Sequence, residues 1–432
     1  MIISNIIPKD LRAVKNIFSS LRSRNYRRFF IGQGISLIGT WMQNIALSWL
    51  VYRLTGSVFL LGLIGFTSQI PSFILSPFAG VLTDRFNRHK MMLLAQVLFM
   101  LQSLIMALLV LFNLVAVWHI IVLSIVFGII SAFDAPARHS LVIDLIDKPE
   151  DLGNAIALNS AIFNAARLVG PSVAGIVIAI VGEGICFLLN ATSYIAIIYA
   201  LLKIKIHSKP SVMKTTDLKE SFMEGLRYTF RSVPIRTLLL LLAIMSLAGF
   251  PFIVLLPAYA KEILHGGSDT LGFLMSALGA GALIAALYMA GRKTVLGLGR
   301  LIAMYSVLMG LAIVAASFSR NIYLSLVPFF VGGLSMILSI ASINTMVQTI
   351  ADEDKRGRVM SFYSMALMGT LPFGNLLAGT IASAIGIPYA LLIGGAITVL
   401  TGIWFQVNRK SLRKHVRPIY MTKGILPSLP DE

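Results

Sequence analysis

Twelve apolar stretches, each long enough to cross a lipid bilayer, dominate this sequence. A transmembrane helix needs about 20 mostly apolar residues because the hydrocarbon core is about 30 Å thick. The stretches lie near residues 29–52, 57–83, 90–112, 116–138, 154–181, 185–203, 236–261, 269–290, 300–319, 322–348, 359–384 and 388–408. Since 57% of the 432 residues are hydrophobic and only 12% are charged, a soluble domain is excluded. We therefore predict an all-α integral membrane protein with twelve transmembrane helices and both termini on one side.

The distribution of basic residues predicts which side that is. All but four of the 36 Lys and Arg residues lie in the segments 1–28, 84–90, 138–153, 203–236, 291–300, 349–358 and 408–432. The exceptions are Arg53, Lys261 and Arg320 in the opposite loops and Arg167 inside a span. Cytoplasmic loops carry the excess of Lys and Arg, so both termini are expected in the cytoplasm. The net charge of +18 is then explained by topology, and we expect the lipid bilayer rather than a nucleic acid as partner.

The longest internal loop separates six spans from six. We expect a cytoplasmic amphipathic segment over 1–28, with a surface helix over 9–24, followed by a six-helix bundle (29–203), a cytoplasmic linker (204–235), a second six-helix bundle (236–408) and a cytoplasmic tail (409–432). Within the linker, Leu218, Phe222, Leu226 and Phe230 repeat every four residues, which predicts a second surface helix ending before Pro234.

The two halves repeat each other. A shift of 204 residues superposes Gly153 on Gly357, Gly170 on Gly374, Gly175 on Gly379 and Gly182 on Gly386. Both copies run from a loop through a span to a short outer turn. We interpret the repeat as a duplication of six helices.

A short turn between the second and third spans carries the sequence Gly80-Val-Leu-Thr-Asp84-Arg85-Phe-Asn87-Arg88-His-Lys90. It resembles the cytoplasmic signature of the major facilitator superfamily, with Asn87 in place of the usual Gly; Asn also tolerates a left-handed turn. The resemblance implies a gate in which Asp84 meets the positive N-terminal end of another helix, near Arg358. Basic residues collect in any cytoplasmic loop, but the Gly and Asp at these offsets favour the gate.

Polar side chains follow one face of the first span. Gln33, Ser36, Thr40, Asn44 and Ser48 share this face, and Gln43 is adjacent. We interpret the face as a water-facing wall and expect Gln33, Thr40, Gln43 and Asn44 to contact the substrate. Stripes of small residues in the fourth and tenth spans fit helix packing and a cavity equally well.

Arg167 stands about 12 residues into the fifth span, or about 18 Å at a helical rise of about 1.5 Å per residue. A charge near the bilayer centre costs about 3 kcal/mol, so its guanidinium requires a partner. Two interpretations stay open. Together with Asn164 it receives an anionic or acceptor-rich substrate group, or it bonds backbone carbonyls across a helix interface.

The sequence Gly170-Pro171-Ser-Val-Ala174-Gly175 follows directly. Pro171 removes a helical hydrogen bond and is expected to kink the helix, while Gly170 and Gly175 permit close helix contact. This segment resembles the span-5 motif that is associated with exporters in the superfamily.

Three further segments narrow the resemblance to the subgroup of enterobactin exporters and macrolide-efflux-like proteins. They are Phe133-Asp134-Ala-Pro136-Ala-Arg138, Asn154-Ala-Ile-Ala-Leu-Asn159 and Glu224-Gly-Leu-Arg227-Tyr. The resemblance implies two parallel six-helix repeats in a bacterial inner membrane and export of a small amphiphile, a siderophore or drug-like molecule, by proton antiport. It also implies that Asp134 pairs with the gate residues Arg85 or Arg88, with Arg138 close by.

Other functions remain as alternatives. An importer or a lysophospholipid transporter would have the same fold. An integral-membrane enzyme would need clustered carboxylates or His, yet the six His are scattered, and there is one Cys, Cys186. We therefore expect a monomeric transporter that is no enzyme and uses neither cofactor nor metal. Asp134, near the cytoplasmic end of the fourth span, is the one acid expected within a span. It is a candidate for proton coupling, but we favour a salt bridge in the gate as its role.

Overall fold

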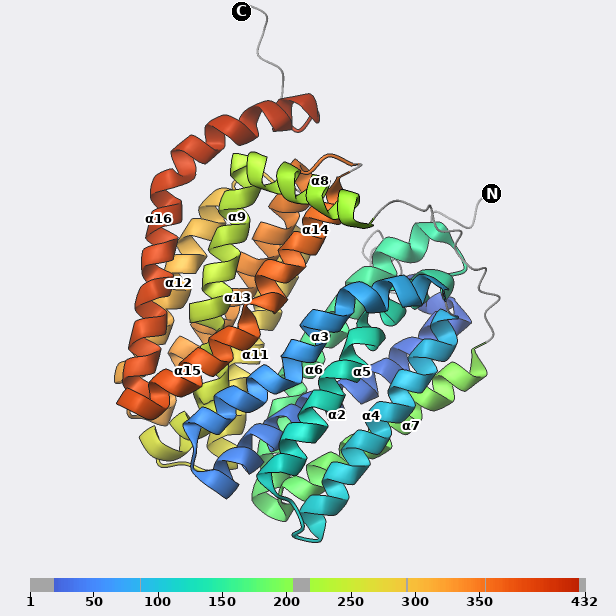
Figure 1. The fold of residues 1–432 in the computed structure, drawn as a ribbon, viewed down its shortest axis with the longest axis vertical. Coiled ribbons are helices and arrows are strands. Elements are labelled where there is room, and N and C mark those ends of the chain that lie inside the picture. The colour runs from blue at the N-terminus through green and yellow to red at the C-terminus, as the bar shows by residue number, and fades with distance from the viewer. Residues whose placement is uncertain (1–18, 86, 205–217, 293, 354, 427–432) are drawn as a thin grey trace, which may run out of the picture. The chain divides into compact units, whose positions relative to one another are not determined.

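The computed structural model of the chain describes residues 19–426 apart from 86, 205–217, 293 and 354, and describes only the backbone at 77, 80–85 and 218–222. All regular structure within these residues is helical (Figure 1). In the described part of the chain, eleven helical segments are long and apolar enough to cross a membrane. Helix α2 (Arg24–Thr55), at 32 residues, has the length of a twelfth span, and its Gln and Asn side chains make it less apolar.

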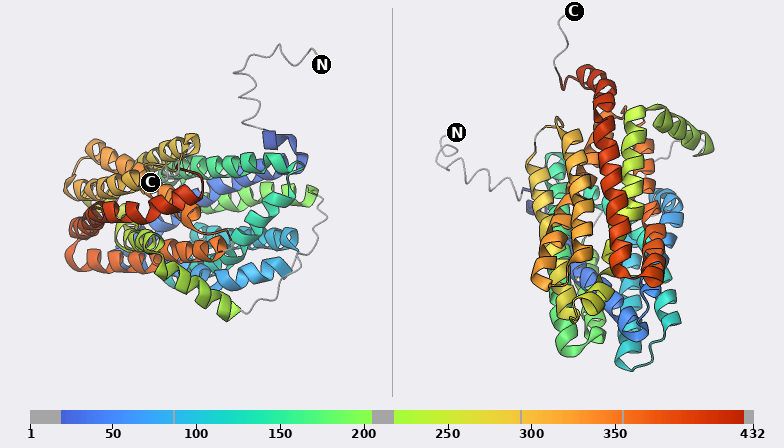
Figure 2. Two further views of the ribbon diagram at one scale, coloured as in Figure 1. Left: turned by 90° about the horizontal axis from the view of Figure 1, so that it is seen from above. Right: turned by 90° about the vertical axis from the view of Figure 1, so that its left-hand side faces the viewer.

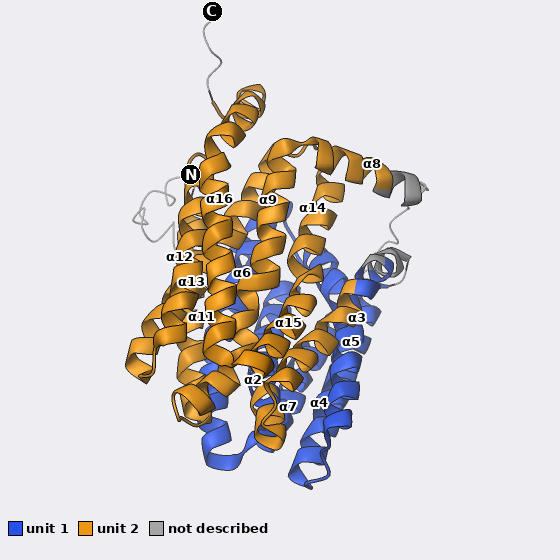
Figure 3. Ribbon diagram, turned by 60° about the vertical axis from the view of Figure 1, so that its left-hand side comes forward, with its two compact units in different colours: residues 1–47, 74–213 blue, residues 48–73, 214–432 orange. Residues whose placement is uncertain are grey.

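Two compact units can be distinguished (Figure 3). Unit 1 comprises residues 1–47 and 74–213, and unit 2 comprises residues 48–73 and 214–432. Both α2 and α3 (Val58–Arg85) therefore contribute to both units. The other helices of unit 1 are α4 (Arg88–Leu111), α5 (Val117–Asp144), α6 (Leu152–Val181) and α7 (Glu183–Lys203).

The core of unit 1 forms where α4 packs against α5 and α7. Aromatic side chains fill its centre: the Phe99 ring stacks on Tyr194 at 5.7 Å and lies 5.0 Å from Phe127. Tyr26 at the start of α2 is fully buried, and its hydroxyl donates to the carbonyl of Ala155 on α6 at 2.8 Å. Burial of these rings contributes most to holding the helices of unit 1 in place.

Unit 2 contains the remaining helices. They are α8 (Leu218–Arg231), α9 (Val233–Ile244), α10 (Leu256–Ala258), α11 (Ser268–Gly291), α12 (Leu298–Phe318), α13 (Ile322–Ile350), α14 (Arg356–Ser364), α15 (Leu371–Ile385) and α16 (Ile387–Thr422). The segment from α9 to Ile263 is irregular: it passes through π-type turns at Met245–Gly249 and Tyr259–Ile263 and a 3-10 segment at Phe250–Leu255. Pro251 and Pro257 lack the amide hydrogen that a regular helix needs, which accounts for part of this irregularity. Helix α16 continues past the ends of the neighbouring α9 and α12 (Figure 2).

Matched glycines make the internal repeat visible in each unit. Gly182 ends α6 with φ 84°, and Gly386 ends α15 with φ 94°, a conformation that favours glycine at both turns. A Cβ on Gly170 would lie 2.9 Å from the carbonyl oxygen of Ile38, and one on Gly374 would lie 2.4 Å from that of Leu247. The same glycine of each repeat thus permits the same close helix contact.

The stripe of serines in the tenth span lies in α13. Ser335, Ser339 and Ser342 are fully buried. Beside them α13 crosses α11 so closely that a Cβ on Gly333 would lie 1.9 Å from the carbonyl oxygen of Leu278. The stripe therefore lies beside a close helix contact, and the hydroxyls of Ser335 and Ser339 have no hydrogen-bond partner among the described residues.

The expectation for Asn87 is wrong. Its φ of −67° is not left-handed. Instead its side-chain oxygen accepts hydrogen bonds from the amides of His89 and Lys90 at 3.0 and 3.1 Å. Asn is one of the best N-caps, because its side chain satisfies amides that the first helical turn leaves unpaired. At this turn Asn87 therefore serves as the N-cap of α4 and does not adopt the left-handed conformation that Gly would allow.

Candidate functional site

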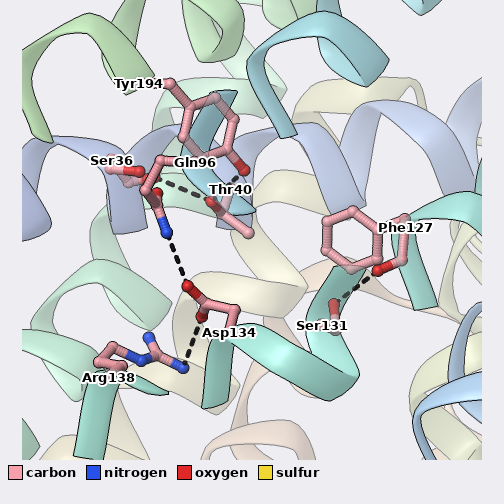
Figure 4. Close-up of polar contacts among 8 residues, drawn as sticks. All are labelled: Ser36, Thr40, Gln96, Phe127, Ser131, Asp134, Arg138 and Tyr194. Carbon is pink, nitrogen blue, oxygen red and sulfur yellow. Dashed lines mark hydrogen bonds and ion pairs between the residues drawn. The ribbon is translucent and has the colours of Figure 1, made fainter. Parts of the chain in front are cut away.

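An ion pair and a hydrogen bond surround Asp134 on α5 (Figure 4). The carboxylate is buried, with 7% of its residue surface exposed. One oxygen accepts a hydrogen bond from Nε2 of Gln96 on α4 at 2.6 Å, and the other lies 3.4 Å from the guanidinium of Arg138, one turn along α5. A buried charge requires such compensation, and Asp134 receives it from an amide and a cation.

The expected pairing of Asp134 with Arg85 or Arg88 stays a prediction for Arg85, while Arg88 contacts another acid. Arg88 lies at the first position of α4 and pairs with Asp144 at the end of α5, at 3.7 Å. Arg138 pairs with Asp134 in its place, since residues four apart on one helix face each other. The other expected partner, Arg85, together with Gly80 and Asp84, lies outside the residues whose side chains the structure describes.

Thr40 of the polar face of α2 approaches the same region. Its hydroxyl donates to the carbonyl of Ser36 at 2.9 Å and lies 3.1 Å from the hydroxyl of Tyr194 on α7 (Figure 4). Gln33, one turn earlier than Ser36, is buried, and its amide oxygen has no hydrogen-bond partner among the described residues. An unpaired buried acceptor is costly, which marks Gln33 as a position open to a further partner.

Gln43 has a different environment. Its amide oxygen accepts from Ser103 and from Asn190, both at 2.6 Å, and its amide nitrogen donates to Gln102 at 3.1 Å. These residues come from α2, α4 and α7, and all four are buried. Gln43 therefore joins three helices in a buried polar network. Asn44, which follows it, is half-buried.

Arg167 on α6 faces an aromatic surface. Its guanidinium carbon lies 5.5 Å from the ring centroid of Trp41 on α2, and the ring of Phe163 meets Trp41 edge-on at 5.7 Å. The side chain is half-buried, and its Nε has no hydrogen-bond partner. Within the described residues no carboxylate and no carbonyl receives the guanidinium, so the carbonyl-bonding alternative finds no support. A cation over a Trp face is stabilised by the ring. This contact does not use the N–H donors of the guanidinium.

Asn164 lies one turn before Arg167. Its amide donates to the carbonyl of Ser160 at 2.8 Å, and its side chain stays half-buried. Beyond Arg167, α6 runs without a break through Pro171 to Val181, and both Gly170 and Gly175 are buried in it. Pro171 stands four residues after Arg167, so it cannot donate to the carbonyl of Arg167.

Several of these contacts could not be found from the sequence. The residues concerned are Gln96, Trp41, Phe163 and Tyr194. Three of them are aromatic, and nothing in the sequence around any of the four indicates its partner. Tyr194 and Gln96 each fall on a buried helical face, which predicts burial but no partner. In the described part of the chain, no three His, Cys, Asp or Glu side chains gather as metal ligands would.

Helices long enough to span a membrane, a duplicated glycine framework and charged groups buried within the first repeat together define a polytopic membrane transporter. Residues 15–416 match the family described as transmembrane secretion effectors, and the chain belongs to this family of the major facilitator superfamily.

Curated relatives align over nearly their whole length. The staphyloferrin A transporter of Staphylococcus aureus is 26% identical over 88% of this chain and 96% of its own. The multidrug efflux pump Tap of Mycolicibacterium fortuitum is 24% identical over 86% of this chain and 91% of its own.

Solved structures share the fold. A bacterial homologue of the human lysosomal transporter Spinster, crystallised in an inward-facing conformation, superposes with a TM-score of 0.64 at 14% identity, covering 92% of this chain and 97% of that one. The human organic anion transporter MFSD10 gives a TM-score of 0.62 at 14% identity, covering 89% and 99%. The protein is thus a multi-pass membrane transporter with the fold of this superfamily.

Proposed function

We propose that this transporter exports a small anionic amphiphile across a bacterial inner membrane by alternating access. The observation that carries the proposal is Arg167, a guanidinium inside a membrane helix with an aromatic face on one side and no bound acceptor. A planar fork of donors suits a carboxylate or catecholate group, and Trp41 and Phe163 suit the apolar part of such a molecule. The description of the family and the names of its relatives support efflux as the direction.

Proton antiport would supply the driving force through Asp134. Protonation of this carboxyl would remove its ion pair with Arg138 and turn its hydrogen bond with Gln96 from a charged into a neutral one. The weaker hydrogen bond with Gln96 lowers the free energy that holds α4 and α5 together at this point. We therefore propose that Asp134 takes up a proton when Arg138 moves away.

The proposed gate and topology follow the charge pattern. Asp84 would meet the start of α14, near Arg358 to Ser361, when the cytoplasmic side closes. Both termini and the linker 204–235 would lie in the cytoplasm, between six-helix bundles at 29–203 and 236–408. The transporter would act as a monomer and carry out no enzymatic step.

Transport into membrane vesicles of opposite orientation tests the proposal. In inside-out vesicles with an acidic lumen, we expect uptake of the anions staphyloferrin A or carboxyfluorescein, loss of that uptake with a protonophore, and no uptake of the permanent cation ethidium. Thiol labelling of Ser411→Cys and Leu114→Cys, both at exposed positions, in a Cys186→Ala background reports the orientation. Anion uptake only by right-side-out vesicles would indicate an importer, and uptake of ethidium alone would refute the role of Arg167.

A further inference from the structure

Helix α16 is longer than one membrane crossing requires. It has 36 residues, from Ile387 to Thr422, and contains neither Asp nor Glu. At a rise of about 1.5 Å per residue it is about 54 Å long, whereas the hydrocarbon core of a bilayer is about 30 Å thick. The part from Ile387 to Asn408 carries no charged side chain, and Arg409 is the first cation. The last turns of α16 therefore lie beyond the hydrocarbon core.

Exposed side chains along α16 mark the face that lipid covers. Leu400 and Val407 are 65% and 72% exposed, and Trp404 between them is also exposed. In a bilayer, exposed apolar side chains of this kind are surrounded by acyl chains, and Trp is enriched where the acyl chains end. Trp404 and Val407 therefore place the edge of the hydrocarbon core close to residue 407.

A stripe of cations continues this lipid-facing side. Residues three and four apart lie on the same side of a helix, and Val407 is followed at these spacings by Lys410, Lys414 and Arg417. All three side chains are exposed, and we call them the basic stripe. Among the residues that the structure describes, none of the three forms an ion pair. The described part of the chain thus provides no counter-charge for the basic stripe.

A different face of the same turns holds α16 against the rest of unit 2. Its buried residues recur every four positions; they are Leu412, Val416 and Tyr420. Beyond them the ammonium of Lys423 donates to the carbonyls of Thr349 and Ala351, at 2.8 and 2.7 Å. These carbonyls lie at the end of α13, where a cation is favourable. Since both ends of the last turns are attached, and these turns bend over unit 2 (Figure 1), the basic stripe has a fixed position.

We propose that the basic stripe binds the phosphate groups of anionic phospholipids in the leaflet at which α16 leaves the membrane. Lys410 and Lys414 lie about 4.5 and 10.5 Å beyond Val407 along the helix axis. The headgroup layer of each leaflet is about 5–7 Å thick. Because a Lys stem can direct its ammonium along the helix, both ammonium groups reach this layer. Arg417 lies farther out, within the Debye length of about 8 Å over which the surface charge of the membrane acts.

The position of the basic stripe favours a lipid over other anions. A nucleic acid or an acidic protein would also attract cations, but neither requires them to begin where the lipid-facing side chains end. A polybasic segment directly beside a transmembrane helix is typical of binding to anionic lipids. The substrate and the direction of transport do not enter this argument, so it stands apart from the proposed function.

Quenching of Trp404 fluorescence by brominated lipids tests the proposal. The protein is reconstituted into phosphatidylcholine bilayers with increasing fractions of brominated phosphatidylglycerol, and brominated phosphatidylcholine provides the reference. The difference between wild type and Trp404→Phe isolates the signal of Trp404 from that of the other Trp residues. A Lys near the membrane surface contributes about 1 kcal/mol, or about a five-fold preference for the anionic lipid. We expect Lys410→Gln and Lys414→Gln each to lower this preference about five-fold.

Lys148→Gln is the matched control, because Lys148 is an exposed cation that already pairs with Glu150, at 3.9 Å. It removes the same charge and should leave the preference unchanged. Equal quenching by the two lipids in wild type, or an unchanged preference when Lys410 and Lys414 are both replaced, would overturn the proposal. An equal loss in Lys148→Gln would also overturn it, since net charge would then be the cause. Binding of nucleic acid through the same residues without any lipid preference would assign the basic stripe to another partner.

Discussion

At the scale of single residues, the contacts of Arg167 favour a binding role for this residue over a structural one. Its guanidinium makes a cation–π contact with Trp41, and its Nε has no acceptor. An arginine that stabilised the fold through hydrogen bonds would be satisfied within the protein. Among the described residues Nε of Arg167 has no acceptor, and we propose that a substrate supplies one.

We predict that Arg167→Lys and Arg167→Gln lose substrate affinity without losing stability. A hydrogen bond to a charged group contributes about 1.5–3 kcal/mol, so the dissociation constant of an anionic substrate should rise about 10- to 150-fold. In Arg167→Gln the loss of the contact with Trp41, about 0.5–2 kcal/mol, is offset because a partly desolvated charge is removed, whereas Arg167→Lys keeps a cation that can contact the ring. Equilibrium binding and thermal unfolding in detergent measure the two effects. Normal affinity together with a clearly lower melting temperature would make Arg167 a structural residue.

At the scale of helices, close approach through glycine decides how α6 is placed. Gly170 lies against α2, where an added Cβ would be 2.5 Å from Cβ of Trp41. Arg167 lies one turn before Gly170 on α6, so the close contact between Gly170 and Trp41 places the Trp41 ring beside Arg167. The exporter-like Gly-Pro segment thus has a specific packing role beside the kink that it is expected to produce.

A pair of glycine substitutions on α6 tests this role. Gly170→Ala should destabilise the protein by about 1–3 kcal/mol, the usual effect of overpacking, and should lower the transport rate as Trp41 is displaced. Gly153→Ala, at a position on the same helix with no atom within 4 Å of the added methyl group, should be neutral or stabilising by up to about 1 kcal/mol. Thermal unfolding and transport assays of both variants provide the comparison. Equal stability of the two variants would contradict the proposed packing.

The sequence predicted helices better than it predicted contacts. Hydropathy located the spans, and the matched glycines located the repeat, because both signals depend on local composition and spacing. The pairing of Arg88 with Asp144 depends instead on how α4 and α5 face each other. The pairing of Asp134 with Arg138 lies within α5, at a spacing of four residues that the sequence already contains. The prediction of a left-handed turn at Asn87 was wrong because Asn is common both in such turns and at helix N-caps. Nothing in the neighbourhood of Arg167 in the sequence indicates Trp41, which lies on a distant helix.

At the scale of the whole molecule, the two repeats share a framework but differ in chemistry. Gly170 and Gly374 make equivalent helix contacts, whereas the buried ion pair of Asp134 and the guanidinium of Arg167 belong to unit 1. The contact of the linker helix α8 with α14 belongs to unit 2. We expect the first repeat to bind substrate and protons. Such a transporter would move substrate out of the cytoplasm and protons into it.

Proton movement driven by substrate tests this account most directly. Purified protein is placed in liposomes with its cytoplasmic face outward, a pH indicator is enclosed in the lumen, and staphyloferrin A or carboxyfluorescein is added outside. The account predicts that the anion enters while protons leave, so the lumen becomes more alkaline, and that Asp134→Asn abolishes the pH change. Anion entry without alkalinisation of the lumen, or an unchanged response in Asp134→Asn, would contradict it.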